Sequence, residues 1–195
     1  VFILSSIALW FMGYNAVTTA FSKYVTGFLG METKQAAAIL MIAQAVATIA
    51  FIPVGLVSRK LGRKKSIMAG VVLLAIVFGT AFFYRGFSPL MYISFTFVGI
   101  SWAMINVNSL PMVLEMSKGG NVGKYTGYYY TFSMAAQVVT PIASGALLQY
   151  VGYETLFPYA TLFVALSFVT MFFVKHGDSK PAAPASALEA FDTPD

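Results

Sequence analysis

The segment SIMAGVVLLAIVFGTAFFY, Ser66–Tyr84, contains nineteen consecutive residues without a charged side chain. A helix of about 20 apolar residues is long enough to cross the roughly 30 Å hydrocarbon core of a bilayer. Strands of a membrane barrel would instead show strict alternation over about 10 residues, and that pattern is absent. Five further runs also lack Asp, Glu, Lys and Arg: Val1–Ser22, Gln35–Ser58, Gly86–Leu114, Tyr125–Tyr153 and Thr155–Val174. The sequence therefore predicts an all-α membrane protein with six transmembrane helices.

The overall composition excludes a soluble globular domain. Hydrophobic residues make up 58% of the 195 residues and charged residues only 10%, against about 45–50% and about 25% in an average soluble domain. So few polar side chains cannot cover a water-facing surface. The chain also has no cysteine, which excludes a disulfide framework, a thiolate metal site and a cysteine nucleophile.

The charged residues gather in short clusters between the uncharged runs, and six spans place these clusters alternately on two sides. Nine cations fall on one side: Arg59, Lys60, Arg63, Lys64, Lys65, Lys118, Lys124, Lys175 and Lys180. Three fall on the other side: Lys23, Lys34 and Arg85. Because Lys and Arg are enriched in cytoplasmic loops, we expect a multi-pass protein of the cell membrane with both termini in the cytoplasm. The net charge of +5 then reflects orientation in the membrane and not a nucleic-acid partner.

The chain divides into two parts by composition. Residues 1–176 form the predicted six-span transmembrane half-domain. Residues 177–195 are rich in Pro and Ala and mildly acidic, which predicts a disordered cytoplasmic tail. The chain begins with Val1 inside a hydrophobic run and not with Met, so we expect a fragment whose beginning is missing.

Polar side chains follow one face of four of the six predicted spans. The fifth span has the most regular pattern, with residues three or four positions apart: Thr126, Tyr130, Ser133, Gln137, Thr140 and Ser144. The third and sixth spans are poor in such groups. Because polar groups at bilayer depth are costly, we expect the first, second, fourth and fifth spans to surround a polar cavity and the other two to face lipid. An apolar helix then comes third in each of two three-span repeats.

The alternative is that these side chains only form hydrogen bonds between packed helices. A sugar-like ligand needs both donors and acceptors, which Asn and Gln carboxamides supply, and an aromatic ring can stack on a pyranose. The candidate substrate-binding residues are Tyr14, Asn15, Thr18, Gln44, Trp102, Asn106, Ser109, Tyr130, Ser133 and Gln137. There is no carboxylate pair, no HExxH motif and no second histidine, so we expect no enzyme activity, no metal and no cofactor.

The second loop reads Gly55-Leu-Val-Ser-Arg59-Lys-Leu-Gly62-Arg63-Lys64-Lys65. It resembles the cytoplasmic loop motif of the major facilitator superfamily, G-x-x-x-D-R-x-G-R-K. The glycines would permit a tight turn beside a neighbouring helix, and the cations would hold the cytoplasmic interface. Arg59 stands where the family's Asp usually sits, so the loop departs from the family pattern at this position.

Four further segments resemble the bacterial sugar-transporter branch of this superfamily, near the sucrose–proton and glycoside–cation symporters. They are Tyr14–Thr19, Trp102–Asn108, Pro111–Glu115 and Gly123–Tyr130. The resemblance covers about residues 1–176. It implies half of a major facilitator fold, spans seven to twelve, with a missing N-terminal six-span half. It also implies alternating access, a small-molecule sugar or glycoside substrate held at the midplane of the lipid bilayer, and coupling to a cation, usually a proton.

Glu115 is the only acid within reach of a span, and three interpretations of it remain open. It is an ordinary interfacial charge, a partner of Arg59, Arg63 or Lys124 in a cytoplasmic gate, or a titrating proton site. The last is the weakest because Glu115 falls near the cytoplasmic end of its span and not at bilayer depth. We predict a cytoplasmic gate made by Arg59, Arg63 and Glu115, with the key proton-binding acid in the missing half.

Two functions from other classes remain as alternatives to a secondary active transporter. One is a six-span channel or pore subunit, which would require a selectivity ring or a re-entrant loop. The loops of this chain are too short and unpatterned for either. The other is a membrane scaffold without transport, whose polar faces would tolerate replacement by alanine.

Overall fold

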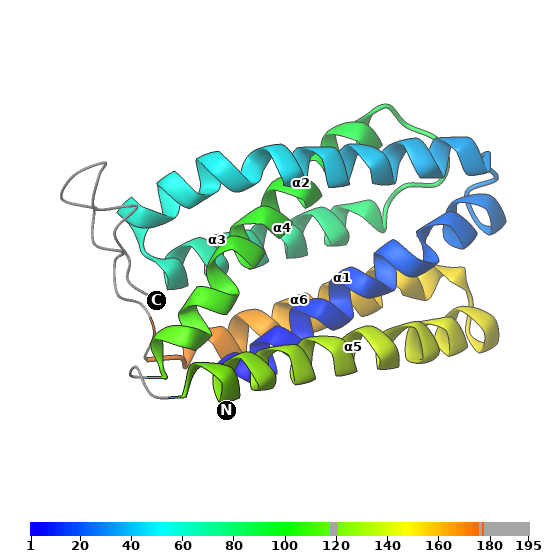
Figure 1. Ribbon diagram of the computed structural model, residues 1–195. Coiled ribbons are helices and arrows are strands. Elements are labelled where there is room, and N and C mark those ends of the chain that lie inside the picture. The colour runs from blue at the N-terminus through cyan, green and yellow to red at the C-terminus, as the bar shows by residue number, and fades with distance from the viewer. Residues whose placement is uncertain (118–120, 176, 178–195) are drawn as a thin grey trace.

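The computed structural model describes residues 1–117, 121–175 and 177. Within these residues the chain forms six long helices (Figure 1): α1 Phe2–Gly27, α2 Thr33–Leu61, α3 Arg63–Ala81, α4 Leu90–Glu115, α5 Val122–Tyr150 and α6 Leu156–Phe172, the last preceded by the short 3-10 helix η1 Tyr153–Thr155. Six spans that include these helices, η1 with α6 among them, are long and apolar enough to cross a membrane. The predicted all-α fold class is confirmed. Apart from Gly177, the predicted tail lies outside the described residues.

The helices continue past the uncharged runs that predicted them. The first runs through Lys23 to Gly27, and the second runs through Arg59 and Lys60 to Leu61. Charged residues at the end of a span reach water with their long side chains, so the backbone stays helical beyond the hydrocarbon. Only residues 28–32 connect these two helices.

A single residue, Gly62, connects α2 and α3. Its backbone has φ of +93°, in the region that side chains other than glycine rarely adopt. The amide N–H of Gly62 donates to the Ser58 carbonyl to close α2, and the Gly62 carbonyl accepts from Ser66 in the first turn of α3. The positive φ of this turn therefore explains why the loop motif has a glycine at position 62.

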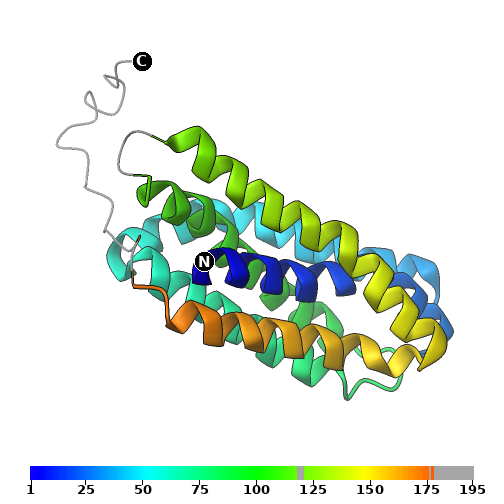
Figure 2. The same ribbon diagram turned by 90° about the horizontal axis from the view of Figure 1, so that it is seen from below.

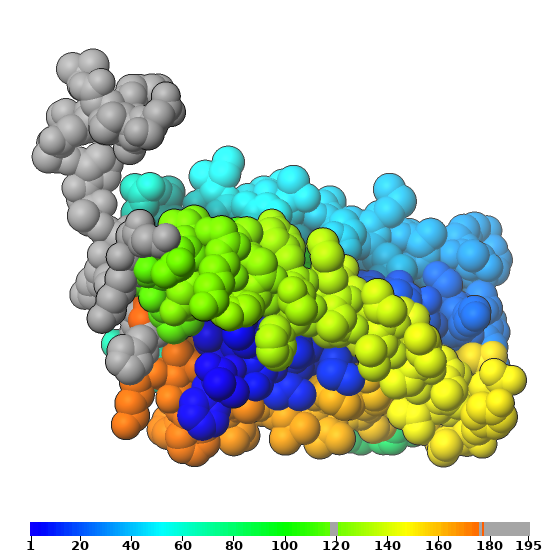
Figure 3. Space-filling model, turned by 60° about the horizontal axis from the view of Figure 1, so that its bottom comes forward, coloured from blue at the N-terminus to red at the C-terminus, as the bar shows by residue number. Residues whose placement is uncertain are grey.

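The six helices pack as two groups of three. Neither group is one of the three-span repeats predicted from the sequence, because each contains one helix of the other repeat. In one group α4 packs against both α2 and α3, and in the other α1 packs against both α5 and α6. The two groups meet mainly where α3 packs against α6. The first helix of each sequence repeat thus belongs to the other repeat's packing group, and α1 reaches the surface between α5 and α6 (Figure 3).

Two glycines allow the closest of these approaches. A Cβ atom at Gly99 on α4 would collide with the Ala43 carbonyl and the Ala47 amide nitrogen of α2. A Cβ atom at Gly13 on α1 would lie 2.8 Å from the Ala160 carbonyl of α6. Small residues at helix contacts bring backbones close and increase van der Waals packing, which is the main attraction between helices in lipid.

The helix ends fall into two sets at opposite ends of the bundle. The N-terminus, the α2–α3 turn, the end of α4, the start of α5 and the end of α6 lie together in Figures 1 and 2. We call this the basic end, because seven described cations lie there: Arg59, Lys60, Arg63, Lys64, Lys65, Lys124 and Lys175. The connections α1–α2, α3–α4 and α5–α6 lie at the opposite end.

Candidate functional site

An aromatic pair joins the two helix groups at the middle of the bundle. The rings of Tyr14 on α1 and Trp102 on α4 stack with centroids 3.6 Å apart and planes inclined by 3°. Phe11, one turn earlier on α1, contacts the same indole edge-on at 5.2 Å. Stacked and edge-on rings bury a large apolar area in a specific geometry, so this cluster fixes how α1 crosses α4.

Gln44 extends this cluster to a third helix. Its Nε2 atom donates a 3.0 Å hydrogen bond from α2 to the hydroxyl of Tyr14. The Tyr14 side chain is 6% exposed, whereas Gln44 is exposed and Trp102 is partly buried. The structure thus brings together three predicted site residues from three different helices, with a polar group at the accessible edge of an aromatic stack.

Three predicted carboxamides satisfy their amino groups within their own helices. Asn15 donates to the Phe11 carbonyl at 2.8 Å, Asn106 to the Trp102 carbonyl at 3.0 Å, and Gln137 to the Ser133 carbonyl at 3.3 Å. Their side-chain oxygens accept no hydrogen bond from the described residues. Asn15 and Asn106 are partly buried and Gln137 is exposed, so all three retain acceptor capacity.

The polar face predicted for the fifth span is divided between burial and exposure. Ser133 is 2% exposed, and Thr140 and Ser144 are buried with their hydroxyls bonded to their own helix. Tyr130 and Gln137 are exposed. The predicted stripe therefore lies at the boundary between the packed side and the exposed side of α5. Only some of its residues are accessible.

Ser109 and Ser133 lie in helix contacts and not on an accessible face. Ser109 is fully buried, and its hydroxyl is 3.1 Å from the hydroxyl of Tyr129 on α5. Thr18 is partly buried and donates to the Tyr14 carbonyl at 3.3 Å. Ser109 matches the alternative considered above, in which polar groups connect packed helices, whereas the hydroxyl of Ser133 donates to the Tyr130 carbonyl of its own helix at 3.2 Å.

The sequence patterns missed Tyr129 and Phe11. Tyr129 is buried and lies four residues before Ser133, on the side of α5 that contains Ala136 and Thr140. The helical spacing of Tyr129, Ala136 and Thr140 is visible in the sequence. The neighbouring residue Tyr130 fits the polar stripe, however, so Tyr129 is not among the predicted candidates. A cavity of about 440 Å³ between α1 and α5 near the opposite end was also missed; its polar lining includes Thr19, Lys23 and Gln149.

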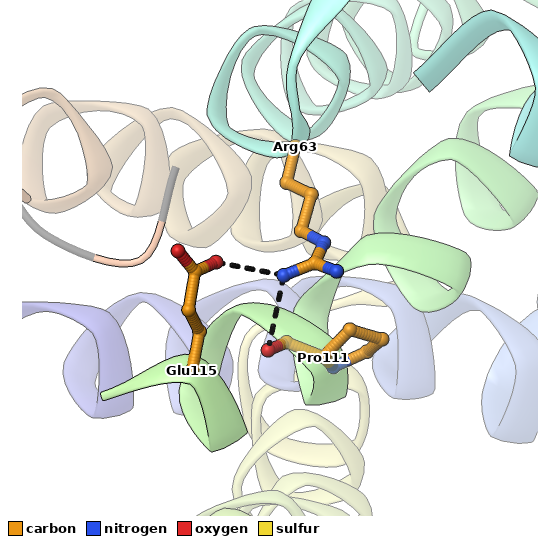
Figure 4. Close-up of polar contacts among 3 residues, drawn as sticks. All are labelled: Arg63, Pro111 and Glu115. Atoms are coloured by element: carbon orange, nitrogen blue, oxygen red, sulfur yellow. Dashed lines mark hydrogen bonds and ion pairs between the residues drawn. The ribbon is translucent and has the colours of Figure 1, made fainter. Parts of the chain in front are cut away.

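An ion pair connects α3 to α4 at the basic end. Nη1 of Arg63 lies 2.7 Å from Oε2 of Glu115, and the same nitrogen donates to the Pro111 carbonyl at 3.5 Å (Figure 4). The side chains are 20% and 23% exposed. A largely covered, hydrogen-bonded pair is stronger than one in open water, so it holds the end of α4 against the start of α3.

The next cation of the loop motif connects α3 to the end of α6. Nζ of Lys64 donates to the Phe172 carbonyl at 3.0 Å and also to the Val174 carbonyl. A cation at the C-terminus of a helix satisfies free carbonyls and opposes the negative end of the dipole. Arg59 is exposed and has no partner among the described residues, so the motif's first cation differs from the two that follow the turn.

Six membrane-length helices, with an aromatic and polar cluster where three of them meet, define a multi-pass membrane protein with a candidate site for a small molecule. The family model described as the Major Facilitator Superfamily matches residues 2–193. The chain therefore belongs to this family of membrane transporters, whose members are not enzymes. Comparison with curated proteins gave no match.

Proposed function

We propose that this chain is the C-terminal half, spans seven to twelve, of a secondary active transporter for a sugar or glycoside. The observation that carries the proposal is the Tyr14–Trp102 stack with Gln44 bonded at its edge. Aromatic faces contact the apolar face of a sugar ring, and carboxamides match its hydroxyls as donors and acceptors. The site lies between helices of a bundle, where transporters hold their substrates.

The proposed contact residues are the accessible members of the predicted set. They are Asn15, Thr18, Gln44, Trp102, Asn106, Tyr130 and Gln137, with Tyr14 behind Trp102 and Gln44. Buried Ser109 and Ser133 support the helices beneath this surface and do not touch the substrate in the conformation described. Free carboxamide oxygens on different helices would each accept from a different sugar hydroxyl.

We assign the basic end to the cytoplasm, in agreement with the positive-inside rule. Arg63 and Glu115 then lie at the cytoplasmic gate together with exposed Arg59. Their ion pair lies within this half, so its proposed role is to position α3 and α4 as one body during alternating access. Arg59 would instead reach across to the other half.

The N-terminal six-span half is part of the proposal, because a transport path needs helices on both sides of the substrate. Carboxamides at bilayer depth are costly against lipid, and Gln44 and Gln137 are both exposed on this chain. A second half facing α1 and α4 would cover them and enclose the substrate. Coupling to a proton would use an acid in that half, since the acids within the described spans, Glu115 and Glu154, lie at the ends of these spans.

The test is an uptake screen with the full-length protein in proteoliposomes. Mono- and disaccharides are supplied with and without an inward proton gradient. The proposal predicts saturable uptake of at least one sugar, with accumulation only when the gradient is present. Uptake that never saturates and ignores the gradient would indicate the channel alternative, and no sugar uptake at all would contradict the substrate class.

A further inference from the structure

A second cavity lies on the side of α2 away from Gln44. It has a volume of about 470 Å³ and is lined by Val46, Ile49, Pro53 and Val57 of α2 and by Ile100 and Met104 of α4. The four α2 residues are three or four positions apart and form one helical stripe. Gln44 and Thr48 lie on a different side of the helix, so this groove is separate from the proposed sugar site.

Polar groups gather only where the groove approaches the basic end. The Ser58 hydroxyl accepts a 2.9 Å hydrogen bond from Nδ2 of Asn108. Ser66, in the first turn of α3, also lines the groove. Its side chain is 1% exposed, and its hydroxyl has no hydrogen-bond partner in the part of the chain that the structure describes. An unpaired buried hydroxyl is costly, so this end of the groove favours a ligand with an acceptor.

Two cations border the same end. Lys60 follows Val57 by three residues and therefore continues the lining stripe of α2 beyond the groove. Lys65 precedes Ser66 on α3. Both side chains are exposed, and neither has an ion-pair partner among the described residues. Between them lies Gly62, the N-cap residue of α3, which has no side chain to cap the helix. The first amide groups of α3 therefore have no capping side chain, and the positive end of the dipole favours an anion.

We propose that this groove binds an anionic phospholipid. One acyl chain lies along the stripe from Val46 to Val57, and the phosphate meets the start of α3 between Lys60 and Lys65. The helical rise from Val46 to Val57 is about 17 Å, which is close to one leaflet of a roughly 30 Å hydrocarbon core. Apolar lining, a cationic border and an uncapped helix start therefore occur in the order in which a phospholipid presents its chain and its phosphate.

The groove does not suit the other ligands considered for this chain. A sugar would find no polar partner along the apolar stripe, and a soluble phosphate would not need that stripe. The lipid site goes beyond the proposed transport function and does not depend on the substrate. It would survive a failure of the sugar assignment, because its test measures lipid binding and not uptake.

The experiment measures binding of palmitoyl-oleoyl phosphatidylglycerol to the full-length protein by native mass spectrometry, with the matching phosphatidylcholine as the neutral lipid. We expect Lys60→Gln and Lys65→Gln each to weaken phosphatidylglycerol binding by about fivefold and the double variant by about 30-fold. Phosphatidylcholine binding should not change. Lys124→Gln removes an exposed cation from α5 at the same end and is the matched control, with no expected effect.

Two further experiments test the groove itself and distinguish a lipid phosphate from a soluble phosphate. Val57→Trp fills the groove at a position that is 47% exposed and should reduce phosphatidylglycerol binding with both lysines intact; a thermal melt verifies its folding. Glycerol phosphate in excess should not compete with the lipid. Wild-type binding by the double variant, an equal loss in the Lys124 control, full competition by glycerol phosphate, or normal binding by folded Val57→Trp would each overturn the proposal.

Discussion

Arg59 and Arg63 are four residues apart in one basic segment, yet their surroundings differ. Arg63 follows the glycine turn, lies at the base of α3 and reaches Glu115. Arg59 lies before the turn, on the exposed side of α2. The turn at Gly62 reverses the chain, so the same residue type has an internal partner on one side and open space on the other. Sequence alone left Arg59, Arg63 and Lys124 as equal partners for Glu115.

The first prediction concerns this ion pair. Glu115→Gln removes the negative charge and leaves a partly buried guanidinium without its counterion, which should cost about 1–3 kcal/mol of stability. We expect slower net transport with intact sugar binding in counterflow assays. Lys124→Gln removes an exposed cation at the same end; it is the matched control and should change stability by less than about 0.5 kcal/mol. Equal effects of the two variants on stability would show that the ion pair has no special role.

The second prediction concerns the hydrogen bond from Gln44 to Tyr14. Gln44→Leu keeps the volume but leaves the tyrosine hydroxyl unpaired at the edge of the stack, so we expect KM for the sugar to rise about 5–10-fold, equivalent to about 1 kcal/mol. Thr48→Val, one turn further along α2, removes a hydroxyl that bonds only to its own helix and should leave KM unchanged. Initial uptake rates over a range of sugar concentrations measure both. A KM unchanged by Gln44→Leu would remove Gln44 from the site.

At the scale of a helix, the sequence predicted where each helix lies in the chain better than which of its residues are buried or exposed. Uncharged runs located all six long helices, because the bilayer excludes charge and requires internal backbone hydrogen bonds. The polar stripe of α5 was correctly periodic, but Ser133 is buried and Gln137 is exposed. Successive members of such a stripe differ in direction by only tens of degrees. Whether a residue lies inside or outside the contact depends on where α1 packs, which no local pattern contains.

The third prediction belongs to the contact between α2 and α4. Gly99→Leu places a side chain against the backbone of Ala43 and Ala47, so we expect a loss of about 1–3 kcal/mol from overpacking. Thermal unfolding in detergent measures it. Gly127→Leu is the control, because a Cβ atom there meets nothing within 4 Å. If both variants unfold at the same temperature, the close approach of α2 and α4 is wrong.

At the scale of the whole molecule, the packing of α1 with α5 and α6, and of α4 with α2 and α3, could not be obtained from the sequence. The three-span repeats were visible as a pattern of polar and apolar helices. The exchange of α1 and α4 between packing groups depends on contacts between residues far apart in the chain, such as Gly13 with Ala160. This exchange places Tyr14 and Trp102 face to face at the centre, so the candidate site is a product of tertiary packing.

The account depends most on one claim, that the polar side of α5 faces water and not lipid. The chain has no cysteine, so a single cysteine introduced here is labelled without background once any cysteines of the other half have been replaced. Gln137→Cys and Val139→Cys are both at exposed positions, and their directions around the helix differ by about 160°. A hydrophilic thiol reagent applied to the full-length protein in membranes should label Gln137→Cys quickly, and a transported sugar should slow that labelling. Val139→Cys should remain unlabelled; the reverse pattern, or equal labelling of both, would contradict the account.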